Sequence, residues 1–428
     1  MNYRQNERIN QITQETLIIG VDIAKFYHVA RALDDRGIDL SKKITFRNSL
    51  EGFLKFEQWI AENQAKNKKS KVVIGMEPTG HYWENLARYL RKKQYPAVIV
   101  NTLHVYRSKE LDDNNQTKTD AKDAKIIANL VRDGRYSHPN LLEGAYADLR
   151  EAMNVRNVTL QSLQQVKNKL HRWYDRYFPE YKQVYRSCDT KGLLHIISLY
   201  GLPHEIAEKD PIEIFESLEP KYRRAIGQKR ILSLHKACKK SIGYKESNFA
   251  KKEFQILLNT YHFYQEQMQE IEDSIEEISH QIKEIKTMME MKGMALISAS
   301  SIIAELGDIR KYKDPRQLCK MAGLSLKEHS SGLKKGKTTI SRRGRSVLRQ
   351  VLYKTVMSLI KNNKVFKELH HYYKTRAKNQ LTGKASIIAL CRKLLRILFA
   401  VVHKEEEYNE EKMRQDIIHP KEFLVNAA

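Results

Sequence analysis

The chain has 428 residues, which is long for a single hydrophobic core and favours about two or three domains. Its formal charge of +25, from 76 Lys and Arg against 51 Asp and Glu, exceeds what solubility requires and indicates a polyanionic partner, nucleic acid first. No apolar run approaches the roughly 20 residues that cross a bilayer, so we expect a soluble cytoplasmic protein without a membrane partner. The scattered cysteines predict buried thiols in a reducing compartment: Cys188, Cys238, Cys319 and Cys391.

Residues 16–145 are predicted to form a mixed α/β domain after a polar tail at 1–15. Helices are expected after Ser49, a plausible N-cap, after the Pro-Thr-Gly turn that begins at Pro78, and over the stretch from Lys118. Compact or alternating apolar runs predict the strands, which are expected twice within 16–37 and once each at 42–48, 72–76 and 97–100.

Residues 146–290 are predicted to be helical and to contain a coiled coil. Apolar side chains alternate in steps of three and four over residues 254–289, which makes an a/d seam of about five heptads. The seam is explained equally well by dimerisation, by an internal hairpin with residues 149–180, or by both together. Residues 188–250 have mixed polarity and give no clear prediction.

Residues 291–403 are predicted to form a helical, basic C-terminal domain, followed by a charged tail at 404–428. A Ser-Gly pair at Ser331 stands in its Lys-rich, turn-forming segment. Most such serines only make local hydrogen bonds. The cations that follow would supply the positive field a DNA phosphate needs: Lys334, Lys335, Lys337, Arg342, Arg343, Arg345 and Arg349.

Four carboxylates of the first domain are candidate site residues. Asp22 interrupts an apolar strand, and Glu77 ends the strand before the Pro-Thr-Gly turn. Asp120 and Asp123, three residues apart, share one helix face. Each alone is more readily explained as structural. Together they match the ribonuclease-H-like arrangement in which hard oxygen ligands hold two Mg²⁺ ions for in-line phosphoryl transfer.

Two lysines beside the helical carboxylates point to other faces of the helix and need not neutralise them. They are expected to hold DNA phosphates instead: Lys122 and Lys125.

The motifs VDIAK, EPTGHYW and KTDAKDAKIIA, which contain the four carboxylates, resemble the N-terminal domain of the DEDD transposases of bacterial insertion sequences. That family includes the pilin-gene invertase and bridge-RNA-guided recombinases. The segments KGMALISASSIIAELGDIRKYKDPRQLCKMAGL, HSSG and ISRRGRSVLRQVLY resemble its C-terminal transposase domain. The resemblance covers about residues 17–180 and 288–375.

The resemblance implies a RuvC-like ribonuclease H fold whose carboxylates bind Mg²⁺, and a serine that joins covalently to DNA. The metal ligands would be Asp22, Glu77, Asp120 and Asp123. The serine would be Ser331, with Ser330 beside it as the alternative.

The implied function is that of a transposase or recombinase in the bacterial cytoplasm, associated with the nucleoid. It would cut and exchange strands of donor ends and target DNA through a phosphoserine intermediate, guided by a structured non-coding RNA. A homodimer or tetramer is expected. Two alternatives stay open: a junction-resolving nuclease that uses water as the nucleophile, and a non-catalytic nucleic-acid-binding protein.

Overall fold

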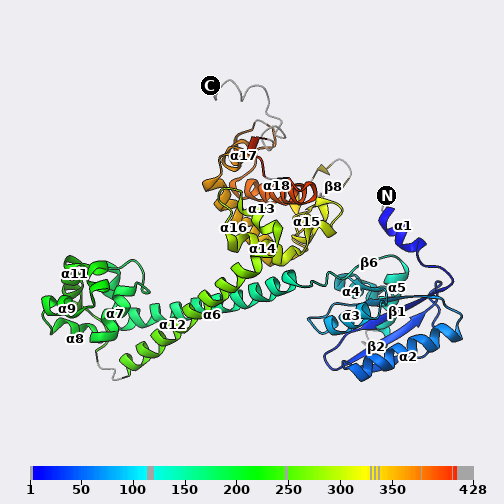
Figure 1. The fold of residues 1–428 in the computed structure, drawn as a ribbon, viewed down its shortest axis with the longest axis horizontal. Helices are drawn as coiled ribbons and strands as arrows, with labels where there is room; N and C mark the ends of the chain where they lie inside the picture. The colour runs from blue at the N-terminus through cyan, green and yellow to red at the C-terminus, as the bar shows by residue number, and fades with distance from the viewer. Residues whose placement is uncertain are drawn as a thin grey trace. The chain divides into compact units, whose positions relative to one another are not determined.

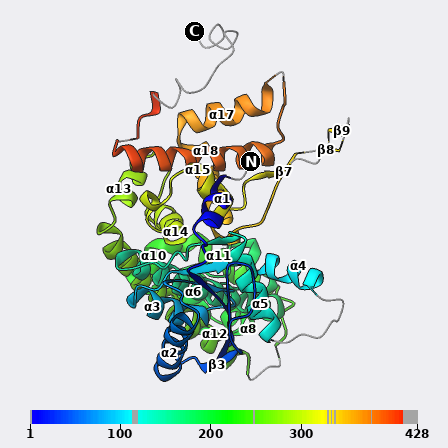
Figure 2. The ribbon, with the colours of Figure 1, turned by 90° about the vertical axis from the view of Figure 1, so that its right-hand side faces the viewer.

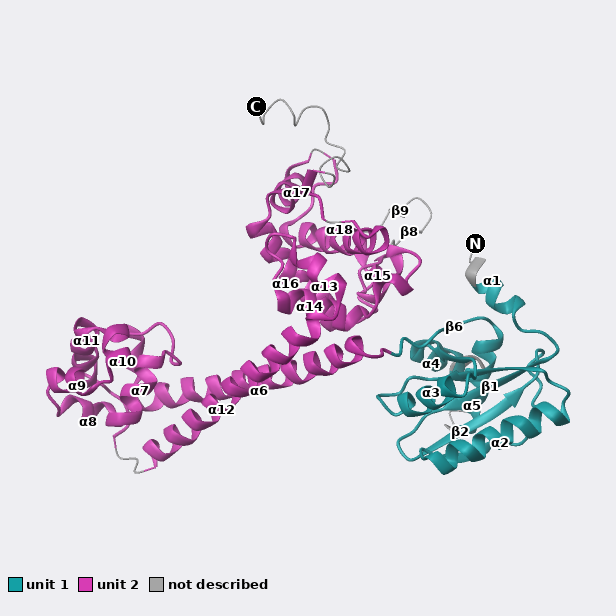
Figure 3. Cartoon of the chain, viewed as in Figure 1, with its two compact units in different colours: residues 1–141 teal, residues 142–428 magenta. Residues whose placement is uncertain are grey.

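The chain divides into two compact units in the computed structural model, residues 1–141 and 142–428 (Figure 3). Unit 1 is a mixed α/β domain, and unit 2 is almost entirely helical (Figure 1). None of the helices that the structure describes combines the length and apolarity needed to cross a membrane. The described residues are 3–112, 120–245, 249–327, 330–331, 334–335, 338–376, 378–406 and 408–411.

A six-stranded sheet in the order β3-β2-β1-β4-β5-β6 forms the centre of unit 1. Its strands are β1 (Thr16–Asp22), β2 (Tyr27–Leu33), β3 (Ile44–Arg47), β4 (Lys71–Met76), β5 (Ala97–Val100) and β6 (Tyr136–Ser137). β1 pairs in parallel with β4, and β4 with β5, while β2, β3 and β6 pair antiparallel with their neighbours. The sequence predicted all of these strands except β6, whose two residues are too few to make a pattern.

Helices cover both faces of this sheet because the side chains of β1 alternate between them. Leu17 and Ile19 pack with α2 and α3, whereas Ile18 packs with α5. Ser49 caps α2 as predicted, since its hydroxyl accepts a hydrogen bond from the Gly52 amide at 3.2 Å. The helices of this unit are α1 (Tyr3–Asn10), α2 (Leu50–Lys66), α3 (Trp83–Lys92), α4 (Thr102–Asp112) and α5 (Asp120–Arg132).

The close approach of α5 to β1 depends on Gly20. A Cβ atom at Gly20 would lie 2.0 Å from the Ala124 carbonyl oxygen and 2.4 Å from the Ala128 nitrogen. Because glycine has no side chain, the backbone of α5 lies directly on the strand. This contact brings the first turn of α5 to the carboxyl end of β1.

Unit 2 is built around a long helical hairpin of α6 (Ala145–Tyr177) and α12 (Ala250–His280), which pack against each other (Figure 1). The structure therefore shows the internal hairpin, one of the two interpretations of the seam. A continuous helix over 254–289 is wrong. The buried Ile282 has extended backbone, and α13 (Lys283–Met289) begins after it. This break turns Ile285 into the core beneath α14 (Leu296–Leu306). The break depends on tertiary packing, so the regular spacing of apolar residues did not reveal it.

A compact lobe is inserted between α6 and α12, and residues 179–245 are called the inserted lobe below. It shares an aromatic core with the adjoining turns of the hairpin, including Trp173, Tyr174 and Phe254. Three of its helices have proline at their first position, a helix-start signal that was available in the sequence. Its elements are η1 (Pro179–Gln183), α7 (Lys191–Tyr200), α8 (Pro203–Ala207), α9 (Pro211–Ser217), α10 (Pro220–Ile226) and α11 (Gln228–Lys239).

The C-terminal part of unit 2 is helical, as predicted, with a short β ribbon between helices. α17 lies beside α18 in both views (Figure 2). The remaining helices are η2 (Ile309–Lys311), α15 (Pro315–Met321), α16 (Ser346–Asn362), α17 (Lys364–Thr375) and α18 (Gly383–Lys404). The ribbon pairs β7 (Leu326–Lys327) with β10 (Thr339–Ile340), and β8 (Ser330–Ser331) with β9 (Lys334–Lys335).

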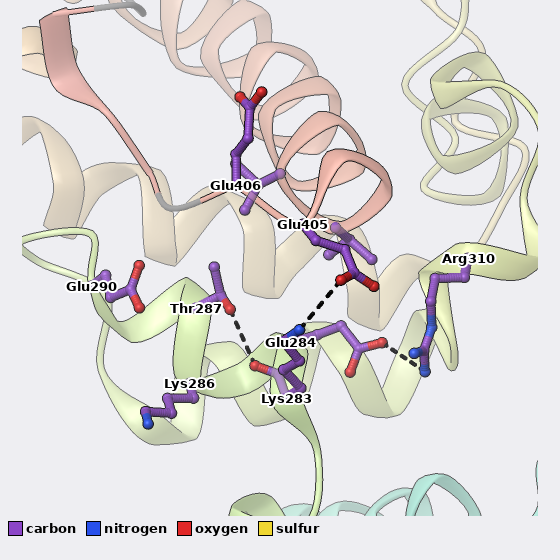
Figure 4. Close-up of a pocket in the computed structure, with 10 residues that line it drawn as sticks. Lys283, Glu284, Lys286, Thr287, Glu290, Arg310, Glu405 and Glu406 are labelled. Carbon is purple, nitrogen blue, oxygen red and sulfur yellow. Dashed lines mark hydrogen bonds and ion pairs between the residues drawn. The ribbon is translucent and has the colours of Figure 1, made fainter.

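A cavity of about 280 Å³ lies between α13 and the end of α18 (Figure 4). Two ion pairs join charges of its lining: Lys283 Nζ lies 3.6 Å from a Glu405 carboxylate oxygen, and Arg310 lies 3.2 Å from the buried Glu284. The Tyr146 hydroxyl also donates to Glu284 at 2.9 Å. Because these partners already satisfy the buried carboxylate, we interpret the cavity as a structural ion-pair network.

Unit 1 contains a buried histidine that should make its stability depend on pH. Both ring nitrogens of His28 lack a hydrogen-bond partner, and the ring packs between Phe46 and Phe53. Burial lowers the pKa of His28 from 6.5 to about 4, with the Asn48 side chain opposing the shift. The folded state thus disfavours the proton, so the associated stability is present above pH 6.5 and is lost as the pH falls toward 4.

The shift corresponds to a loss of about 3 kcal/mol across that range. Urea unfolding at pH 7 and pH 4 should show this loss in wild type relative to the His28→Leu variant, whose apolar side chain cannot titrate. A difference between the two proteins that stays constant with pH would contradict the expectation.

Candidate active site

Two of the predicted carboxylates lie at the same edge of the sheet. Asp22 is the last residue of β1, and Glu77 directly follows β4. Val21 and Met76 are register partners in the parallel β1–β4 pair, so the next residue on each strand is an acid. Both acids are half-buried. The carboxyl ends of parallel strands are where open α/β sheets place their ligands.

The other two carboxylates come from the first turn of α5, the helix that packs on β1 at Gly20. Asp120 begins the helix and is exposed, whereas Asp123, one turn later, is buried, with 5% of its surface exposed. A carboxylate that is this buried needs a cation or hydrogen-bond donors.

The pKa of the Asp22 carboxyl is influenced by all three of the other acids. Its pKa is raised from 3.8 to about 6, first by burial and then by the charges of Asp123, Asp120 and Glu77, with Lys109 opposing. The structure therefore brings the four carboxylates, predicted from three separate motifs, into one electrostatic neighbourhood. A buried carboxyl whose pKa is raised by neighbouring acids, as that of Asp22 is, is typical of functional sites.

Lys109 is the cation of this neighbourhood, and the sequence did not indicate it. Its Nζ lies 2.5 Å from Asp123 Oδ2. Lys109 belongs to α4, a helix whose apolar residues do not recur at helical spacing. The ion pair between Lys109 and Asp123 joins two different helices and arises from tertiary packing. No local sequence signal could therefore have predicted it.

The chemistry of the donors fits Mg²⁺, which prefers carboxylate oxygens. An added divalent cation would also relieve the mutual repulsion that raises the pKa of Asp22. Within the described ranges, however, no three His, Cys, Asp or Glu side chains converge closely enough to hold an ion as they stand. The ammonium group of Lys109 is the cation that pairs with the Asp123 carboxylate in this structure.

The two lysines of α5 both interact with protein groups, and their role in holding DNA phosphates stays a prediction. Lys125 Nζ lies 2.8 Å from a carboxylate oxygen of Asp39, whose other oxygen lies 2.8 Å from Arg31. Lys125 thus links α5 to the β2 side of the sheet. Lys122 is half-buried on the same helix and also interacts with protein groups.

Ser331 lies in the β ribbon of unit 2. Its backbone pairs with that of Lys334, and the backbone of Ser330 pairs with that of Lys335. The predicted serine and two of the predicted lysines are therefore neighbours across a hairpin. The side chains of these four residues lie outside the described part of the structure, as does all of Lys337.

The predicted arginines fall into two groups. Arg345 lies 3.3 Å from the Glu305 carboxylate and donates to the Glu305 carbonyl at 2.8 Å, and Arg349 donates to the Ala322 carbonyl at 3.0 Å. These two anchor the loop before α16. Arg342 and Arg343 are exposed and form no ion pair with any described residue, so they keep their charge for a partner.

Comparisons with known proteins match both halves of the chain to one family. A DEDD transposase model of the IS110 type, described as "Transposase", matches residues 19–179, and the "Transposase IS116/IS110/IS902 family" model matches residues 285–371. Both matches contain candidate site residues.

Relatives extend the similarity over most of the chain. The pilin gene-inverting protein of Moraxella bovis is 22% identical over 396 residues, 92% of this chain and 97% of that protein. The mini-circle putative transposase for IS117 of Streptomyces coelicolor is 23% identical over 74% of this chain and 78% of its own. The transposase for insertion sequence element IS1111A of Coxiella burnetii is 28% identical over 32% of this chain and 38% of its own. The chain belongs to the IS110 family of DEDD transposases.

Proposed function

We propose that this transposase cuts and rejoins DNA by Mg²⁺-dependent phosphoryl transfer, with Asp22, Glu77, Asp120 and Asp123 as the metal ligands. The observation that carries the proposal is geometric: Asp22 and Glu77 stand at the ends of adjacent parallel strands, and the helix that packs on β1 at Gly20 begins with Asp120 and Asp123. Bound Mg²⁺ would stabilise the charge that develops on the phosphate oxygens during transfer.

The topology of unit 1 supports a RuvC-like, ribonuclease-H-like fold. An antiparallel β1–β2–β3 meander is followed by the parallel strands β4 and β5, and α5 packs across β1. In this topology two of the acids stand at the ends of adjacent strands, β1 and β4, and the other two stand on α5, the helix that packs on β1.

Ser331 is the proposed nucleophile. Its oxygen would bond to a backbone phosphorus as the bond from that phosphorus to a deoxyribose oxygen breaks, and the proton lost by the serine hydroxyl would pass to the released deoxyribose oxygen. A deoxyribose hydroxyl of a second strand would then displace the serine, which completes strand exchange. The neighbouring Lys334 and Lys335 and the exposed Arg342 and Arg343 would hold the phosphates.

Guidance by a structured RNA, and assembly as a dimer or tetramer, are part of the same proposal. The charge of +25 supports a large polyanionic partner, and it suits RNA as well as DNA. Delegating sequence choice to base pairing would leave the protein to contact mainly the phosphate backbone.

The Ser331→Ala variant tests the serine chemistry. Incubation with DNA that carries the element's ends and Mg²⁺ should give a covalent protein–DNA adduct in wild type, visible as a band of low mobility after denaturation. The variant should give no adduct, because it lacks the attacking oxygen. Ser330→Ala is the matched control and should retain the adduct.

The same experiment separates the alternatives. A junction-resolving nuclease with water as its nucleophile would keep cutting DNA in the Ser331→Ala variant. Loss of the adduct in Ser330→Ala and its retention in Ser331→Ala would move the nucleophile to the adjacent serine and contradict the assignment.

A further inference from the structure

In the inserted lobe, acidic and basic residues lie in two different stretches of the sequence. Residues 220–245 contain nine Lys and Arg and no Asp or Glu, whereas residues 200–219 contain six Asp and Glu and one Lys. The basic stretch forms α10 and α11, and the acidic stretch forms α8 and α9, which pack against α11 (Figure 3). The lobe lies almost entirely outside the two family matches, which end at residue 179 and resume at residue 285.

One face of α11 is a stripe of unpaired cations. Ile231, Leu234 and Cys238 turn into the core of the lobe. The opposite face exposes one polar residue at each helical turn, and the C-cap residue directly after α11 continues the row. These residues define the α11 stripe: Lys229, Ser233, Lys236 and Lys240. None of its three lysines forms an ion pair with a described residue. The stripe therefore keeps its full charge toward solvent.

An open hollow of about 500 Å³ lies at the start of this stripe. It is lined by the first turn of α11, including Lys229 and Arg230, and by Val184 of the segment after η1. Gly227 has a φ of +75°, and a Cβ atom there would meet nothing within 4 Å. The hollow thus combines open space, two cationic side chains and the positive end of the helix dipole.

We infer that the α11 stripe and its hollow bind the phosphate backbone of duplex DNA. The stripe carries no aromatic side chain on which unpaired bases could stack, so recognition falls to the phosphates. The acidic helices α8 and α9 would repel DNA and so orient the lobe with α11 toward it. Contacts of this kind position DNA without reading its sequence.

This inference deepens the proposed function, because it takes DNA as the substrate and adds a surface remote in sequence from the candidate active site. It does not depend on the metal or on the serine. If the catalytic proposal is wrong, the DNA-binding prediction can still be correct, and it has its own test.

The full-length Lys229→Gln/Lys236→Gln/Lys240→Gln variant tests the inference. Affinity for a duplex of arbitrary sequence should fall roughly tenfold, and the slope of log affinity against log salt should shrink by roughly 3, because each lost phosphate contact removes about 0.9 from the slope. A matched variant removes the same charge from exposed lysines of unit 1 and should bind with the wild-type slope: Lys55→Gln/Lys66→Gln/Lys92→Gln.

A second variant protects the test from a folding artefact. Ser233→Glu puts a carboxylate into the α11 stripe at an exposed position and should weaken duplex binding without changing the melting temperature. Wild-type affinity and salt slope in both stripe variants would overturn the inference. It would also be overturned if the variants lost affinity only for an RNA hairpin and kept it for duplex DNA. Neither result bears on whether Asp22→Asn stops cleavage, so the two proposals fail separately.

Discussion

Replacing Asp22 by asparagine is expected to reduce DNA cleavage on the order of 10³-fold while leaving DNA binding intact. The amide keeps the size of the side chain but removes the negative charge that would bind a divalent cation. Cleavage of DNA carrying the element's ends, measured beside a binding titration, gives both quantities. Asp133→Asn, at the other end of α5, is the matched control and should cleave normally.

The stability of the same variant separates a metal ligand from a structural acid. Because the folded protein raises the pKa of Asp22 to about 6, the charged form, which still predominates at pH 7, is less favourable there than in the unfolded chain. Removing that charge should leave the melting temperature unchanged or raise it when Mg²⁺ is absent. An Asp22→Asn protein that melts at a lower temperature and still cleaves DNA would instead indicate a structural carboxylate.

The Gly20→Ala substitution is expected to cost roughly 1–3 kcal/mol of unfolding free energy, as overpacking of a close contact typically does. The added methyl group would collide with backbone atoms of α5, at Ala124 and Ala128, which cannot rotate away. Urea unfolding measures the loss.

The helix that must shift also carries Asp120 and Asp123, so cleavage should fall together with stability. Gly383→Ala provides the control, since a Cβ atom there meets nothing within 4 Å. A Gly20→Ala protein as stable and active as wild type would show that the approach of α5 to β1 does not position the carboxylates.

Local patterns in the sequence were sufficient to predict most of unit 1. Buried parallel strands are rich in apolar residues, so β5 and the part of β4 after Lys71 are each visible as a compact run. Glu77 could be placed at a strand end because it follows such a run. Asp22 was instead predicted to lie within its strand, whereas the structure ends β1 at that residue. The i to i+3 spacing of Asp120 and Asp123 likewise follows from helix geometry.

The features that escaped prediction depend on tertiary contacts. Lys109 pairs with Asp123 across two helices, and α4 lacks the periodicity that would have revealed it. The break at Ile282 interrupts an unbroken apolar seam without glycine or proline, because burial of that side chain decides it. In the inserted lobe α8, α9 and α10 are too short for periodicity, although Pro203, Pro211 and Pro220 mark their starts.

Stabilisation by Mg²⁺ tests the central claim, that the four carboxylates form one metal-binding centre, most directly. Thermal melting of the full-length protein at increasing Mg²⁺ should show a rising melting temperature, because an ion that binds only the folded state stabilises it. The Asp22→Asn/Asp123→Asn variant should show no such rise, and Asp133→Asn should behave like wild type. An equal rise in all three proteins would contradict the account.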